Sequence, residues 1–143
     1  MDKIEELKYN EFIKENKNKF NNEQLFQIEK GINSGIDYSI YAKPEFTAEQ
    51  MRQIRRGLIR NLNVSWYDKP EFNWRQMDVI YSGLIKNIDV SIYAKPEFKW
   101  EQMVEIFLGL VNNLDVSYYA NFEYNVDQMI EIRKGLEQGL DIS

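Results

Sequence analysis

The chain has 143 residues, of which 43% are hydrophobic, 14% aromatic and 29% charged, and this composition is typical of one globular domain. Cysteine and histidine are both absent, which excludes disulfide bonds, thiolate or imidazole metal sites, and catalysis by a histidine base or a cysteine nucleophile. The formal net charge of −5 gives no overall attraction to nucleic acid or acidic membranes, and the lack of a membrane-length apolar run or a signal peptide predicts a cytoplasmic protein without a membrane partner.

The first predicted element is a helix over residues 2–19, whose apolar residues lie partly on one side with lysines and glutamates elsewhere. Its sequence does not match the segments that follow it. The first unit of a stacked array needs a cover over its apolar side. We therefore expect residues 1–19 to form an N-terminal capping helix, and residues 20–143 to form a tandem-repeat solenoid within the same single domain.

A 26-residue repeat begins at about Phe20 and continues to the C-terminus without an insertion. Gln24 and Ile28 recur at this step in all five copies, while Tyr41 recurs in four and Pro44 in three. The repeated glycines are Gly31, Gly57, Gly83, Gly109 and Gly135. A fixed period of this length is the signature of units that stack on their neighbours to bury a continuous core.

Each copy contains a helix with a recognisable start and end, and the second copy is typical. Thr47 is a candidate N-cap with Gln50 three residues on, as in a capping box, and Phe46 and Met51 have the spacing of a hydrophobic staple. Asparagine is the cap in the other copies except the fourth, where Lys99 is a poor cap. The helices, of about 13 residues each, are expected to end at residues that tolerate the left-handed conformation: Gly35, Asn61, Asn87, Asn113 and Gly139.

A return segment of about ten residues connects each helix to the next. In the third copy, Asp89 can cap a short helical turn from Val90 to Ala94, and Pro96 prevents that turn from continuing. A short strand over residues 90–92 is the alternative. We favour the turn because of the alanine and the downstream proline. The recurring aspartates are interpreted as caps of these turns: Asp37, Asp89, Asp115 and Asp141.

The glycine inside each helix requires a reason, because it costs about 1 kcal/mol relative to alanine. We expect it to allow the close approach of a neighbouring aromatic side chain, with the repeated tyrosine of the adjacent unit as the candidate. A ligand-binding glycine is the less favoured alternative, since phosphate-binding glycines lie at the start of a helix. Together these elements predict an all-α fold, an α-solenoid of five 26-residue repeats behind an N-terminal capping helix.

Equivalent positions of the repeat, called slots here, can be compared between copies. Slots whose residue changes are free for solvent or partners, whereas slots whose residue is unchanged are expected to form the stacking core. The fourth helix is apolar in nearly all its variable slots, while its neighbours carry charges there. One interpretation is that these residues fill a bend in the array. The other is a partner-binding patch, with self-association as one version, because exposed aromatic residues rimmed by charge are characteristic of interfaces. The predicted patch consists of Trp74, Tyr81, Trp100, Val104, Phe107, Leu108 and Val111.

The second copy also carries a basic stripe. A solvated helix face, offset by acidic neighbours such as Glu49 and Glu71, is the favoured interpretation. A contact with nucleic-acid phosphates or an acidic partner is the alternative. The stripe consists of Arg52, Arg55, Arg56 and Arg60 in the second copy, together with Arg75 at the start of the third.

No catalytic site, cofactor site or metal site is predicted. Carboxylates that recur with the repeat are interpreted as scaffold, and the sequence contains neither a nucleophile–base constellation nor a phosphate-binding loop. We therefore expect a protein that has no enzymatic activity and needs no cofactor.

The unit EQMxxIxxGLxxNLDVSxYAKPEF, read over residues 49–72 and 101–124 with local deviations, resembles short repeats of low-GC Gram-positive bacteria and their phages. Copies there often read QMxxIRxGLxxGLDVSxYAxPxF. The resemblance covers about residues 20–143 and implies no established activity. Some phage and mobile-element proteins of this size inhibit host defences, including anti-CRISPR proteins, which is an association of context. We expect a protein-binding module, with occlusion of a bacterial defence nuclease as one specific form and nucleic-acid association through the basic stripe as the alternative.

Overall fold

The computed structural model describes residues 2–139 of the chain, and all of its regular elements there are helical. Five of the long helices begin at a regular step of 26 residues, which confirms the predicted repeat and the all-α, solenoid-type fold with an additional helix before it. The long helices are α1 (Lys3–Asn16), α2 (Asn22–Asn33), α3 (Ala48–Ile59), α4 (Trp74–Ile85), α5 (Trp100–Val111) and α6 (Val126–Glu137).

The return segments contain short 3-10 helices rather than strands, which settles the choice between turn and strand. In η3, the Asp89 carboxylate accepts a hydrogen bond from the Ser91 backbone N–H, as expected for a cap. Asp37 and Asp115 do the same in their copies, whereas Asp141 lies outside the described residues. The 3-10 helices are η1 (Tyr38–Ile40), η2 (Val64–Trp66), η3 (Val90–Ile92) and η4 (Val116–Tyr118).

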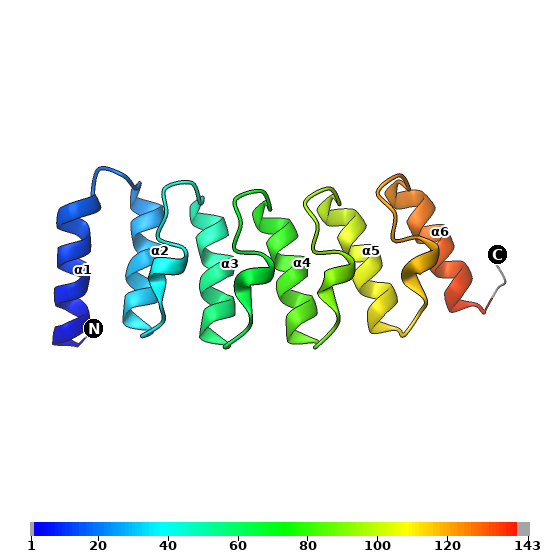
Figure 1. Ribbon diagram of the computed structural model, residues 1–143, viewed down its shortest axis with the longest axis horizontal. Coiled ribbons are helices and arrows are strands. Elements are labelled where there is room, and N and C mark those ends of the chain that lie inside the picture. The colour runs from blue at the N-terminus through cyan, green and yellow to red at the C-terminus, as the bar shows by residue number, and fades with distance from the viewer. Residues whose placement is uncertain (1, 140–143) are drawn as a thin grey trace. The chain divides into compact units, whose positions relative to one another are not determined.

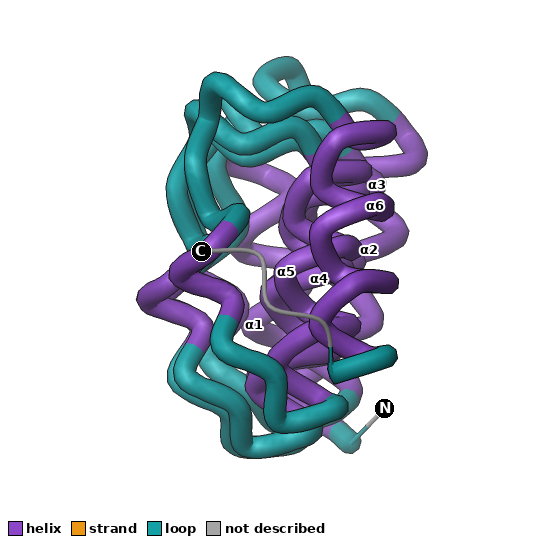
Figure 2. Tube along the Cα trace, turned by 90° about the vertical axis from the view of Figure 1, so that its right-hand side faces the viewer, coloured by secondary structure: helices purple, strands orange, loops and turns teal. Residues whose placement is uncertain are grey.

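The chain forms two compact units, residues 1–77 and 78–143, and the boundary falls within α4. In the first unit, α1, α2 and α3 lie side by side in chain order (Figure 1). In the second, α5 packs against α6. Within each unit the long helices form one layer and the return segments form the other (Figure 2).

The predicted capping boxes are present at the starts of the repeat helices. In α3, the Thr47 hydroxyl accepts a hydrogen bond from the Gln50 N–H, and the Gln50 carboxamide oxygen accepts one from the Thr47 N–H. Lys99 offers no side-chain cap, and only the bond from its own N–H to Gln102 remains in α5. The asparagines that cap the other repeat helices are Asn21, Asn73 and Asn125.

The same glutamine has a second role that its capping position does not reveal. The Nε2 group of Gln50 donates to the carbonyl oxygen of Phe72 at 2.6 Å, in the segment that leads into the next helix. Gln24 makes the equivalent bond to Phe46, and Gln102 makes it to Tyr124. Each of these glutamines therefore caps its own helix and holds the start of the following repeat.

The helices end as predicted, at residues with a left-handed backbone. Their φ angles lie between 57° and 72°, a conformation that glycine and asparagine adopt more readily than other residues. The residues are Gly35, Asn61, Asn87, Asn113 and Gly139.

In the first four repeat helices, the glycine inside the helix makes room for the repeated tyrosine. The Tyr41 hydroxyl donates to the Gln27 carbonyl of α2 at 2.6 Å, and a methyl group added at Gly31 would overlap that hydroxyl. A tyrosine hydroxyl is protonated at neutral pH and can donate, and burial raises the pKa of Tyr41 further above its usual value. The tyrosine was correctly predicted, but its origin was not. It comes ten residues later in the same repeat, because the return segment folds back onto its own helix.

Helix α1 covers the first repeat without burying any of its own residues. The Phe12 ring lies 5.6 Å from Phe20 and 5.8 Å from Tyr38, measured between ring centroids. These aromatic contacts place α1 over α2 and η1, which is the position expected of a capping helix.

The pairing of glycine and tyrosine can be tested in the first repeat. We expect Gly31→Ala to destabilise the protein by about 1–3 kcal/mol through steric overlap, and Tyr41→Phe by about 1 kcal/mol through the lost hydrogen bond. The double variant should be more stable than the sum of the two effects predicts, because the overlapping hydroxyl is gone. Urea denaturation of all four proteins measures this coupling, and strict additivity would contradict the assignment.

Candidate functional site

Helix α5 has two apolar sides. One side is buried and includes Met103, Ile106 and Gly109. The other carries residues at spacings of 4, 3, 1 and 3, which place them in a single stripe along the helix. We call this stripe the α5 face, and it consists of Trp100, Val104, Phe107, Leu108 and Val111.

The α5 face is partly open to solvent. Val111 is 40% exposed, and the other members of the α5 face are half-buried. A groove of about 370 Å³ adjoins its C-terminal end. Its lining combines apolar residues with polar ones: Ile88, Leu110, Val111, Lys86, Asn87, Asp89 and Asn113. The face therefore combines apolar surface with a concave end, which is a common arrangement in binding sites.

The equivalent slots of the other repeat helices contain polar residues. In α6 three of the five are charged, and in α3 three are arginines. Only α5 among the five repeat helices is apolar in every one of these slots. In α6 the slots hold Val126, Ile130, Arg133, Lys134 and Glu137.

Two residues of the predicted patch do not belong to the α5 face. Tyr81 is only 7% exposed, so it offers little surface to a partner. A position that varies between copies is therefore not necessarily exposed. Trp74 is 39% exposed and belongs to the first unit, where the Arg75 guanidinium carbon lies 5.1 Å from the centre of its ring. The structure thus brings five of the seven predicted residues together on one helix.

Exposed aromatic residues also occur outside the predicted patch. Phe26 on α2 is 52% exposed, and Phe122 before α6 is 45% exposed. Phe122 occupies the slot that contains proline in three other copies, and Phe26 occupies a slot that differs in every copy. These departures from the repeat were the sequence signal that could have identified them.

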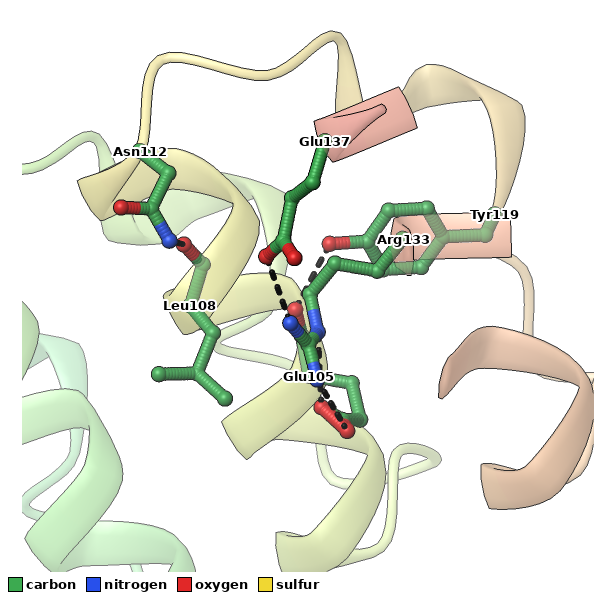
Figure 3. A network of polar contacts seen from close by, with 6 residues as sticks. All are labelled: Glu105, Leu108, Asn112, Tyr119, Arg133 and Glu137. Carbon is green, nitrogen blue, oxygen red and sulfur yellow. Dashed lines mark hydrogen bonds and ion pairs between the residues drawn. The ribbon is translucent and has the colours of Figure 1, made fainter. Parts of the chain in front are cut away.

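In α6, two of the slots equivalent to the α5 face hold Arg133 and Glu137, and these residues form a network of ion pairs and hydrogen bonds (Figure 3). Arg133 lies 3.2 Å from the Glu105 carboxylate of α5 and 2.6 Å from Glu137. Burial alone lowers the pKa of Arg133, but the hydrogen bonds to both carboxylates outweigh it, so the pKa is raised. The Tyr119 hydroxyl donates to the Glu105 carbonyl in the same network. In α6 this slot therefore contributes an ion pair between repeats, whereas Phe107 places an aromatic ring there in α5.

The predicted basic stripe is only partly free for a ligand. Arg55 donates to the Gln27 carboxamide oxygen at 3.1 Å, and Arg56 donates to that of Gln53 at 2.7 Å. The pKa of Arg55 is lowered, mainly by burial and to a smaller extent by the neighbouring arginines. Arg52 and Arg60 remain exposed.

Three further observations bear on the type of protein. Within residues 2–139, no group of three or more acidic, histidine or cysteine residues is arranged to hold a metal ion. In the same part of the chain, no helix has the length and apolar content needed to cross a membrane. Comparisons of the chain with family models, curated proteins and solved structures give no match.

Because the repeats are equivalent, the ion pair between α5 and α6 should be reproducible one repeat earlier, between α4 and α5. Val79 and Phe107 occupy the slots of Glu105 and Arg133 one repeat earlier. We expect Val79→Glu alone to cost about 2–3 kcal/mol, since it buries a carboxylate without a partner. Adding Phe107→Arg should recover about 1–3 kcal/mol of that loss through the new pair. Thermal unfolding of both single variants and the double variant tests this, and a double variant less stable than either single variant would contradict it.

Proposed function

We propose that this chain is a protein-binding module without enzymatic activity, and that its partner docks on the α5 face. The observation that carries the proposal is the apolar character of every variable slot of α5, on surface that is still partly exposed. Aromatic and aliphatic side chains in such positions are typical anchors of protein interfaces. The absence of histidine and cysteine from the sequence supports a function without catalysis.

Contrast with the neighbouring helices supports a binding role over a purely structural one. The second unit contains α6, which packs on α5 with charged residues in three of the corresponding slots. The repeat therefore folds with charged residues at three of these five positions. The additional apolar surface of α5 is best explained by a partner, and repeat proteins commonly bind through such variable surface slots.

One specific form of this proposal is an inhibitor of a bacterial defence system, of the anti-CRISPR type, that occludes a defence nuclease. It rests on the resemblance of the repeat to those of Gram-positive bacteria and their phages. Self-association through the α5 face is a second form. Nucleic-acid association through the basic stripe has less support, because Arg55 and Arg56 are already hydrogen-bonded to glutamines.

The α5 face can be changed with residues that the repeat already uses in the same slots. Asp78, Lys134 and Glu137 occupy the slots of Val104, Leu108 and Val111 in other copies. We expect the triple variant Val104→Asp, Leu108→Lys, Val111→Glu to keep its helicity, measured by circular dichroism, and to lose a partner that the unchanged chain captures from its native host. Because buried interface anchors each contribute about 2 kcal/mol or more, binding should fall at least about a hundredfold.

A matched control is Ile130→Asp, which makes the Val104→Asp change in the same slot of α6. This variant should retain the partner. Light scattering of the triple variant and of the Ile130→Asp control measures their oligomeric state. If the partner is a second copy of the chain, only the triple variant should lose the dimer. Unfolding of the triple variant would show that the α5 face is core, and equal capture by the triple variant and the unchanged chain would remove the α5 face as the binding site.

A further inference from the structure

A second concave surface lies in the first unit, between α2 and α3, which are neighbours in Figure 1. Its volume is about 440 Å³, within the range of ligand-binding clefts. Phe26 and Ala48 supply apolar lining, and Arg52 supplies a cation. This groove is separate from the α5 face, which belongs to the second unit.

Phe26 gives the groove a large exposed apolar surface. It is 52% exposed, although it belongs to a regular repeat helix. The Lys30 ammonium lies 4.9 Å from the centre of the Phe26 ring, close enough for a cation–π contact. An apolar side chain that enters the groove would cover this ring while an anionic group reaches the ammonium.

Positive charge gathers along one part of the groove. Arg52 lines it and is exposed, and Arg55 is tied to the groove residue Gln27 by a hydrogen bond of 3.1 Å. The arginines on either side of Arg55, Arg52 and Arg56, both lower its pKa, which shows that their positive charges reinforce one another. An anion would relieve this repulsion.

Negative charge occupies another part of the groove. Glu23 and Glu49 lie in the first turns of α2 and α3 and line the same groove. A nucleic-acid strand carries a phosphate at every step, so these carboxylates would repel it. A peptide can place carboxylates on the arginines and leave uncharged residues beside the glutamates. The charge distribution therefore favours a peptide.

We propose that the groove between α2 and α3 binds a peptide segment in which a large apolar side chain is followed by carboxylates. The apolar side chain packs on Phe26 and Ala48, and the carboxylates pair with Arg52 and Lys30. This site is additional to the α5 face and does not depend on it.

The test uses the full chain and a fluorescein-labelled peptide in which leucine and tryptophan precede a run of aspartates. Fluorescence anisotropy should show binding to this peptide, weakening as salt is added, and no binding to the same peptide with asparagines instead. Arg52→Asp should weaken binding about tenfold or more. The variant should fold, because Asp78 occupies this slot in α4. Phe26→Ala should also weaken binding.

Arg60→Asp is the matched control, since it makes the same change of charge on an exposed residue outside the groove. It should bind almost as well as the unchanged chain. Equal losses for Arg52→Asp and Arg60→Asp would indicate general electrostatic attraction and overturn the proposal. Tighter binding of a labelled oligothymidylate of the same length, lost on Arg52→Asp, would overturn it in favour of nucleic acid. The triple variant of the α5 face should bind the peptide normally, which separates this site from the proposed function.

Discussion

The stacking of the repeats depends on a buried glutamine near the start of the repeat helix, which caps its own helix and also bonds to the backbone of the next repeat. In Gln50 the carboxamide oxygen accepts the Thr47 N–H, and the amino group donates to the Phe72 carbonyl in the next repeat. A glutamate has no donor for the second bond, and an apolar residue can form neither. Because Phe72 directly precedes the N-cap of α4, the bond that satisfies the glutamine also positions the start of the next helix.

Features that depend on neighbouring residues could be predicted from the sequence. The capping boxes and the left-handed helix ends follow from residues three or four positions apart, and the 3-10 turns follow from an aspartate and a nearby proline. Contacts between segments that are far apart in the sequence were harder to predict. The spacing of Tyr41 did not reveal which helix it packs on, and the capping role of Gln50 hid its bond to Phe72.

Variation between copies was an incomplete guide to the candidate site. It correctly drew attention to α5, where Phe107 replaces the arginine found in α6. It could not distinguish an exposed slot from a buried one, and so it included Tyr81, which is almost fully buried. It also passed over Phe26, since a single aromatic residue in a variable slot is unremarkable until a groove beside it is known. Exposure and neighbouring shape are properties of the assembled helices.

The hydrogen bonds between segments have a further consequence for how the chain folds. The tyrosine bonds join residues 14 apart, the glutamine bonds join residues 20 and 22 apart, and the pair between Arg133 and Glu105 spans 28. Contacts that close only short loops lose little chain entropy, and proteins rich in them fold quickly. Each repeat can therefore acquire its structure as soon as the following one has left the ribosome, without waiting for distant parts of the sequence.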